Sequence, residues 1–145
     1  MRTAEEMLAY VKANGMGHDN IILRRAAKSF KIIEEHLLPN EIVHLAFLGN
    51  FKPKGEDSFG LCAFAMTDSK LIIAQKSIFM EHRIKEFSLR NINNIIERCY
   101  PIYGEIVFSI FQDTFSILQD RDETKNTYRA ILTFLDGLEK KLYPK

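Results

Sequence analysis

The chain has 145 residues, of which 46% are hydrophobic, and a formal net charge of +1. A chain of this length forms one domain whose core is large enough to fold without disulfides. Its near-neutral charge gives no global attraction for nucleic acid or for an anionic bilayer. No apolar run approaches the roughly 20 residues that a membrane-spanning helix needs.

The two cysteines, Cys62 and Cys99, lie in apolar or mixed segments with strand-like patterns, and we expect them to be reduced and buried. Residues 1–12 carry acidic groups where a secretory signal would need an apolar core. We therefore expect a cytoplasmic protein.

Residues 3–14 have the pattern of a short helix. Thr3 is followed three residues later by Glu6, the spacing of a capping box, and Gly15 and Gly17 mark the end. A second helix, capped by Asp19 or Asn20, is predicted to end before Pro39.

The second predicted helix is amphipathic. Its apolar positions share one face: Ile22, Ala26, Phe30, Ile33 and Leu37. Two short helices are not stable alone, so we expect residues 1–40 to form a helical extension that packs on a domain of residues 41–145.

After Pro39 the hydrophobic period becomes that of strands. We expect strands at 42–49, 59–66, 71–77 and 80–89, a fifth ending near Cys99, a sixth around 106–110 and a seventh around 115–117. Residues 50–58 are predicted to be a polar loop because they include Pro53 and Gly55.

The central hairpin organises the predicted sheet. Cys62, Phe64 and Met66 alternate with Leu61, Ala63 and Ala65, which predicts that both faces are buried. The corner between its strands is Thr-Asp-Ser-Lys at 67–70.

From about Asp122 the helical period returns. The predicted apolar stripe consists of Tyr128, Ile131, Leu132, Leu135, Leu138 and Leu142. The whole pattern predicts a mainly β fold with α: a seven-stranded antiparallel barrel, a C-terminal helix that covers one open end, and an N-terminal helical extension.

The corner residues carry a family resemblance. Thr67, Asp68, Lys70, Leu71 and Ile72 match the T-(D/N)-x-(K/R)-L-I corner of bacterial pleckstrin-homology-like domains, which share the PH/GRAM-like superfold.

Two further stretches extend this resemblance over residues 37–142. Phe87, Leu89, Ile92 and Ile95 resemble the next family motif, with Ser88 where the family often has proline. The lead LLPNEIVHLAFLG is similar to that of the YokE-type members. The resemblance implies a binding domain, because the superfold hosts lipid, peptide and protein binding.

Lipid-binding pleckstrin domains place basic residues in the first loop and on the second strand. Here the loop has Lys52 and Lys54, but Glu56 and Asp57 follow, and the strand positions are not basic. A second candidate surface for anionic lipid is the basic strip on the second helix: Arg24, Arg25, Lys28 and Lys31. The aromatic residues that would stack on nucleic-acid bases are missing from this strip, so we predict no nucleic-acid partner.

The sequence offers no catalytic, metal or cofactor motif. His18, His36, His44 and His82 are scattered, and no phosphate loop or paired cysteine spacing is present. We therefore predict no enzyme and no cofactor. An enzyme with an unrecognised site is a third hypothesis, which requires a deep polar pocket with His44 or His82 beside a carboxylate.

Self-association is the leading prediction. The sixth and seventh strands are apolar on both faces. Ile106, Phe108 and Ile117 form the inner face, and the other face carries Val107, Phe111 and Leu118, more apolar residues than one core usually takes. Strand edges of an incompletely closed barrel can also pair. The resemblance implies assembly into rings. We predict a non-catalytic binding and assembly module that contacts protein, including its own copies, with anionic-lipid binding as the alternative.

Overall fold

The computed structural model describes residues 1–17, 23–76 and 81–142. Helices α1 (Ala4–Asn14) and α2 (Leu23–His36) come first. Seven strands follow: β1 (Leu45–Pro53), β2 (Gly60–Met66), β3 (Lys70–Gln75), β4 (Arg83–Ser88), β5 (Ile92–Cys99), β6 (Tyr103–Ile110) and β7 (Asp113–Asp120). Helix α3 (Arg121–Leu142) ends the described chain.

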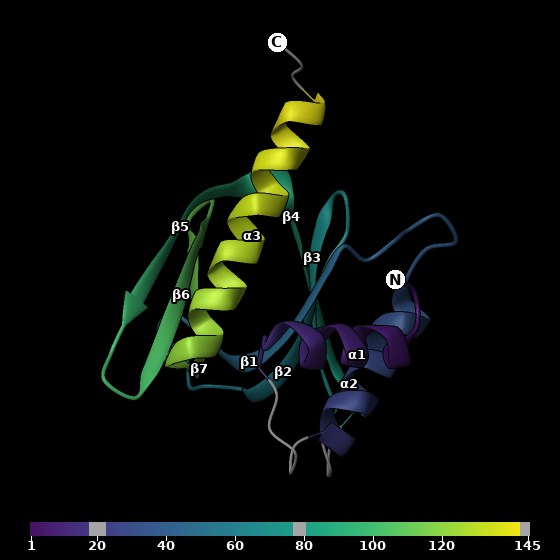
Figure 1. The fold of residues 1–145 in the computed structure, drawn as a ribbon, viewed down its shortest axis with the longest axis horizontal. Coiled ribbons are helices and arrows are strands. Elements are labelled where there is room, and N and C mark those ends of the chain that lie inside the picture. The colour runs from purple at the N-terminus through teal and green to yellow at the C-terminus, as the bar shows by residue number, and fades with distance from the viewer. Residues whose placement is uncertain (18–22, 77–80, 143–145) are drawn as a thin grey trace.

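The seven strands form one antiparallel sheet in the order β4-β3-β2-β1-β7-β6-β5 (Figure 1). Among the described residues β4 and β5 are the two edges, so the sheet curls without closing. A 3-10 turn at Leu89–Asn91 joins these edges, as the spacing of Leu89, Ile92 and Ile95 predicts. The predicted fold class is confirmed.

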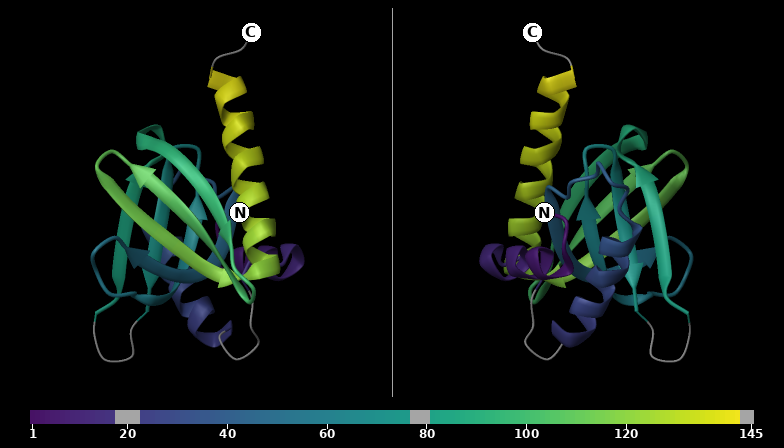
Figure 2. Two further views of the ribbon diagram at one scale, coloured as in Figure 1. Left: turned by 90° about the vertical axis from the view of Figure 1, so that its left-hand side faces the viewer. Right: turned by 90° about the vertical axis from the view of Figure 1, so that its right-hand side faces the viewer.

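The concave side of the sheet holds the main core. Phe47, Phe64, Phe108 and Phe115 lie at its centre, and Phe108 stacks on Phe115 with 5.0 Å between ring centroids. Helix α3 packs against β1, β5, β6 and β7 and covers one opening. Figure 2 shows that α3 also extends well past the sheet.

A second core lies on the convex side of β1, β2 and β3. Helix α1 contacts β1, and α2 contacts β2 and β3. The strand residues of this second core include four alanines: Ala46, Ala63, Ala65 and Ala74. Alanine has no side chain beyond Cβ, so the helices approach the sheet closely and bury Met7, Phe30 and Ile33. The expectation that the helices pack on the strands is confirmed.

The first helix has the predicted ends. Thr3 and Glu6 form a capping box, and Gly15 adopts the left-handed conformation with φ of 60°. The backbone N–H of Ala4 donates to Glu34 Oε1 on α2 over 2.7 Å, which ties the helices together. The predicted caps of the second helix, Asp19 and Asn20, lie outside the described residues.

Two predictions about the helices and strands were wrong. Strand β1 does not end at Gly49, because residues 50–53 pair with Phe115–Leu118 of β7 and continue the sheet through the predicted loop. Leu132 does not belong to the buried stripe of α3: it is 41% exposed, whereas Ile131 is fully buried.

Candidate functional site

One candidate surface is the convex side of the second half of the sheet, which we call the β5–β7 face. Opposed residues of neighbouring strands share a face. The registers therefore place Lys52, Ser116, Val107 and Ile96 in one row and Asn50, Leu118, Glu105 and Arg98 in the next.

No helix of the described chain covers the β5–β7 face, as the left view in Figure 2 shows. Ile96, Val107 and Leu118 form a half-buried apolar cluster on it: Ile96 and Val107 lie opposite each other, and Leu118 lies in the next row. The sequence analysis predicted self-association from Val107 and Leu118 among others. Both side chains lie on this face, and no described helix covers them.

The β5–β7 face also carries an ion pair, between Arg98 and Glu105, in which one carboxylate oxygen has no hydrogen bond. Arg98 Nη1 lies 3.6 Å from Glu105 Oε1, too far for a hydrogen bond. That carboxylate oxygen is buried and has no hydrogen-bond partner among the described residues. A buried, unsatisfied carboxylate oxygen is costly, and a donor from outside would relieve the cost.

A second candidate site is the recess at the barrel mouth, of about 250 Å³. Lys54 and Lys85 line it, together with Glu56 and Asp113. The ammonium of Lys85 lies 5.2 Å from the ring centroid of Phe59, and the Arg83 guanidinium lies 4.5 Å from the same ring. The site is thus a mixed-charge recess with cations held over aromatic rings.

The turn beside this recess contains Phe111. Among the non-glycine residues that the structure describes, Phe111 alone has a positive φ, of 53°. Its ring is 69% exposed although the backbone conformation is unfavourable for it. Lys54 N–H donates to Thr114 O over 2.9 Å, so the first loop and this turn adjoin.

The predicted basic residues fall into separate groups. Lys54 reaches the mouth recess, whereas Lys52 belongs to β1 and lies in the Ser116 row of the β5–β7 face. Arg24, Arg25, Lys28 and Lys31 are all exposed on α2. Lys31 pairs with Glu34.

Sequence reasoning missed Lys85 as a residue that lines the mouth recess. Its spacing places it on the same face of the strand as Phe87, but only the sheet registers bring that face near the first loop.

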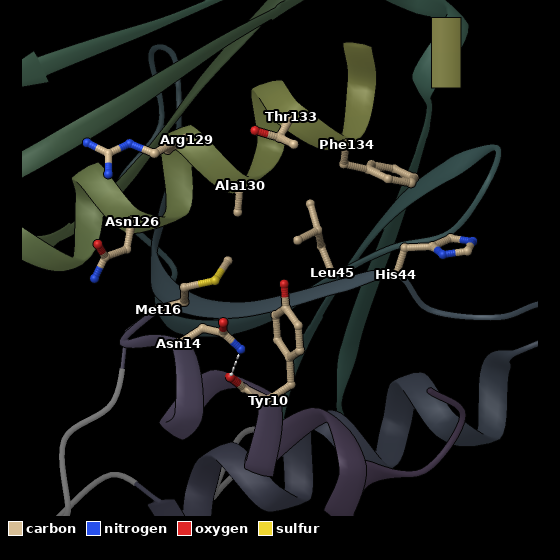
Figure 3. A pocket seen from close by; sticks show the side chains of 10 residues that line it. All are labelled: Tyr10, Asn14, Met16, His44, Leu45, Asn126, Arg129, Ala130, Thr133 and Phe134. Carbon is tan, nitrogen blue, oxygen red and sulfur yellow. Dashed lines mark hydrogen bonds between the residues drawn. The ribbon is translucent and has the colours of Figure 1, made fainter. Parts of the chain in front are cut away.

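A third candidate is the α1–α3 cleft, of about 440 Å³, lined by Tyr10, Asn14, Met16, His44, Leu45, Asn126, Arg129, Ala130, Thr133 and Phe134 (Figure 3). His44 Nε2 lies 2.8 Å from Asp68 Oδ1, the pairing that the enzyme hypothesis required. Both side chains are exposed, 38% and 64%. The pair is thus open to solvent.

The two thiols differ in environment. Cys62 is buried on β2, and burial raises the pKa of its thiol to about 12. A thiol with so high a pKa is inert at neutral pH. Cys99 is exposed near the end of the edge strand β5, so the expectation that it is buried was wrong. Neither cysteine of the described chain forms a disulfide.

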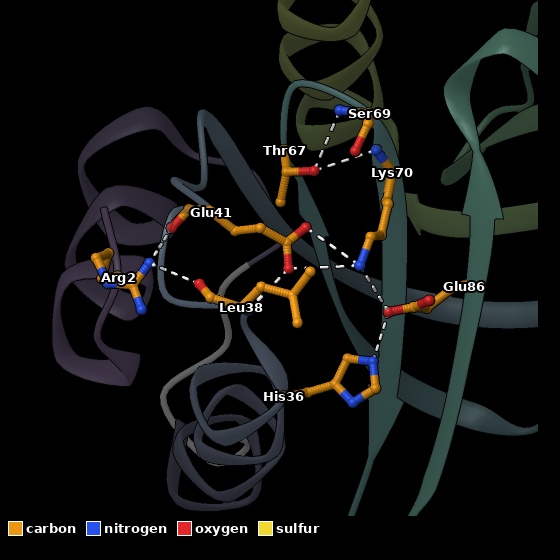
Figure 4. A network of polar contacts seen from close by, with 8 residues as sticks. All are labelled: Arg2, His36, Leu38, Glu41, Thr67, Ser69, Lys70 and Glu86. Carbon is orange, nitrogen blue, oxygen red and sulfur yellow. Dashed lines mark hydrogen bonds and ion pairs between the residues drawn. The ribbon is translucent and has the colours of Figure 1, made fainter.

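The Thr67–Lys70 corner has a structural role (Figure 4). Thr67 Oγ1 accepts hydrogen bonds from the backbone N–H groups of Ser69 and Lys70, which fixes the turn. Lys70 Nζ then contacts Glu41 Oε2 at 3.2 Å and Glu86 Oε1 at 3.3 Å. The corner thereby joins the segment after α2 to strand β4.

His36 at the end of α2 extends this network by contacting Glu86. Burial alone would raise the pKa of Glu86, but hydrogen bonds from His36 and Lys70 outweigh it and hold the pKa below its usual value. Burial would likewise lower the pKa of Lys70, and hydrogen bonds from Glu41 and Glu86 raise it instead. The network therefore favours the charged forms of both groups.

Within residues 1–17, 23–76 and 81–142, no group of three or more His, Cys, Asp or Glu side chains is placed to hold a metal ion. Nor does any helix in these segments have the length and apolarity to cross a membrane.

A curled antiparallel sheet of seven strands with a C-terminal helix over one opening defines the class of pleckstrin-homology domains. The family model described as "Bacterial PH domain" matches residues 37–133, which is more than half of the chain. The protein belongs to this family, and the bacterial pleckstrin-homology-like resemblance inferred from the sequence is confirmed.

One solved structure with a similar fold is described as "Crystal Structure of an N-terminally Truncated Linker-DH/PH Domains of p115-RhoGEF". The likeness has a TM-score of 0.41 and 14% sequence identity, and it covers 85% of this chain and 38% of that chain. No curated protein matches the sequence.

Proposed function

We propose that this bacterial PH domain is a non-catalytic binding and assembly module that contacts protein through its β5–β7 face, with a second copy of the chain as the partner. The supporting observation is the difference between the two convex halves of the sheet. One half is covered by α1 and α2, while the other leaves Ile96, Val107 and Leu118 without a covering helix.

A second copy fits this face because the face is self-complementary. In a two-fold arrangement each surface meets its own equivalent. The exposed Arg98 guanidinium of one copy can then lie near the Glu105 carboxylate of the other, which pairs opposite charges across the two-fold axis. Ile96, Val107 and Leu118 of one copy then pack against the same three residues of the other copy, beside these charged groups.

Light scattering on size-exclusion fractions over a range of protein concentrations tests the proposal. We expect a species larger than the monomer that dissociates on dilution. Val107→Lys should raise the dissociation constant about tenfold or more, because it puts a charge in an apolar contact. Asn40→Lys, an exposed change of equal charge after α2, is the matched control and should leave it unchanged. A strict monomer at the highest attainable concentration would contradict the proposal.

A second candidate function is contact with anionic lipid at the barrel mouth. It is favoured by Lys54 and Lys85 in one recess, beside an exposed Phe111 that is held in an unfavourable backbone conformation. Sedimentation with phosphatidylserine vesicles tests it. Binding should fall with added salt and with Lys54→Gln plus Lys85→Gln, whereas Lys125→Gln should not change it. Equal binding to neutral vesicles would speak against this function.

A further inference from the structure

The exposed side of helix α2 carries positive charge outside the segment that matches the family model. That model covers residues 37–133, whereas α2 ends at His36. Three exposed cations lie in the first half of α2, and a fourth exposed cation directly follows strand β3. These four residues, which we call the α2 cluster, are Arg24, Arg25, Lys28 and Lys76.

A buried serine joins Lys76 to the helix. Ser29 is 5% exposed, and its Oγ accepts a hydrogen bond from the backbone N–H of Lys76 over 3.1 Å. Ser29 directly follows Lys28 and lies four positions after Arg25, so all three belong to neighbouring turns of α2. The hydrogen bond therefore holds a residue of the sheet beside the helical cations, although 47 positions separate Lys76 from Ser29.

The α2 cluster has no acidic partner in the described segments 1–17, 23–76 and 81–142. Lys31, one turn farther along α2, is different because it pairs with Glu34. Within the cluster, Arg24 and Lys28 lie four positions apart, where like charges repel each other and slightly destabilise a helix. An anionic surface outside the chain would relieve this repulsion.

The surroundings of the cluster indicate which kind of anion it suits. A protein interface is anchored by large apolar or aromatic side chains, and none of the described large apolar side chains that are exposed lies on α2. Single-stranded nucleic acid stacks on aromatic rings, but Phe30 of α2 is fully buried. An anionic bilayer needs neither feature, because its charge is spread over a plane and attracts every Lys or Arg side chain near it.

We propose that the α2 cluster is a contact site for an anionic bilayer, with its four cations at the level of the lipid head groups. The attraction is electrostatic, so the contact is reversible and weakens as salt is added. This site depends neither on the β5–β7 face nor on the mouth recess that Lys54 and Lys85 line.

Flotation of the full chain with vesicles tests the proposal. The parent for this test carries Lys54→Gln and Lys85→Gln, which remove the cations of the mouth recess. We expect it to bind vesicles of phosphatidylcholine and phosphatidylglycerol in equal parts at low salt, and not to bind phosphatidylcholine alone. Adding Arg25→Gln and Lys28→Gln should lower the partition coefficient about thirtyfold, because each cation near an anionic bilayer contributes about 1 kcal/mol, or about fivefold.

A control pair removes the same charge elsewhere. Lys140→Gln plus Lys141→Gln changes two exposed residues at the far end of α3, which lies at the opposite end of the molecule from α2 (Figures 1 and 2). This pair should leave the partition coefficient unchanged. Glutamine forms helices about as well as lysine and arginine, so the circular dichroism spectrum should be that of the parent for both pairs.

Two further measurements separate the bilayer from other anions. Arg24→Lys plus Arg25→Lys keeps the charge and should keep vesicle binding, whereas a specific phosphate site would lose the paired hydrogen bonds of its guanidinium groups. Poly-glutamate and single-stranded RNA serve as an acidic peptide and a nucleic acid, and both should bind more weakly than the vesicles.

Four results would overturn the proposal. One is loss of all vesicle binding in the Lys54→Gln plus Lys85→Gln parent, which would assign the lipid contact to the mouth recess instead. The others are equal partition coefficients for the Arg25→Gln plus Lys28→Gln pair and the control pair, loss of binding on exchange of arginine for lysine, and tighter binding of poly-glutamate or RNA than of vesicles.

Discussion

The two convex halves of the sheet follow the same alternation of side chains but have different neighbours. On β1–β3 the outward positions are largely alanine, and helices α1 and α2 lie on them. On β5–β7 the outward positions are Ile96, Val107 and Leu118 among serines and charged groups, and no described helix lies there. Alternation shows which residues share a face. The size and polarity of those residues decide whether a helix of the same chain can pack on that face.

This difference assigns separate roles to the two halves. The covered half is a second hydrophobic core, held at its border by the Lys70 network that joins Glu41 to β4. The other half has no described helix on its convex side, while α3 covers its concave side. The N-terminal helices thus complete the fold on one half of the sheet and leave the convex side of the other half uncovered.

The largest effect is expected for a cavity in the covered half. Phe30→Ala on α2 removes a fully buried ring and should lower the free energy of unfolding by about 3–5 kcal/mol. Val107→Ala on the β5–β7 face removes a half-exposed side chain and should cost less than about 1 kcal/mol. Chemical denaturation of both variants measures the difference. Equal losses would show that α2 adds no core of its own.

The next effect concerns the helix that covers the concave side. A Cβ at Gly104 on β6 would lie 2.4 Å from Thr124 Oγ1, a buried hydroxyl that donates to Asp120 O over 2.9 Å. Gly104→Ala should therefore displace the start of α3 and destabilise the protein by about 1–3 kcal/mol. Thermal unfolding measures this loss.

A matched glycine variant controls that experiment. A Cβ at Gly137, farther along α3, would meet no atom within 4 Å. Gly137→Ala should thus stabilise the helix by up to about 1 kcal/mol. If Gly104→Ala were as stable as the parent protein, the close contact between β6 and α3 would not constrain the fold.

Much of the fold could be predicted because its signals are local. The capping box at Thr3 and Glu6, the two-faced hairpin around Phe64 and the inward residues of β6 and β7 all follow from spacing. The length of β1 could not be predicted this way. Pro53 normally ends a strand, but here the ladder with β7 continues to it, and only the partner strand decides that.

The candidate sites were less predictable because they combine distant segments. Lys54 and Lys85 share a recess although 31 positions separate them in the sequence. The α1–α3 cleft depends on how an N-terminal and a C-terminal helix approach the same strand. A single sequence carries no periodicity that reports such contacts.

The smallest predicted effect is a pH dependence at the border of the covered half. Glu86 has a pKa below its usual value because the hydrogen bonds from His36 and Lys70 outweigh burial. A lowered pKa stabilises the folded state at pH values above the unfolded value of about 4.3, and this contribution disappears as the pH falls through the folded value. Glu86→Gln should therefore cost about 0.5–1 kcal/mol at neutral pH and progressively less below about pH 4.

The comparison with a carboxylate outside the network makes this prediction decisive. Glu139→Gln changes an exposed carboxylate on α3 and should leave the acid limb of the stability profile unchanged. Urea unfolding of the parent and both variants between about pH 3 and pH 7 gives the three profiles. If the cost of Glu86→Gln stayed constant down to the lowest pH, the charge on Glu86 would not link α2 to β4.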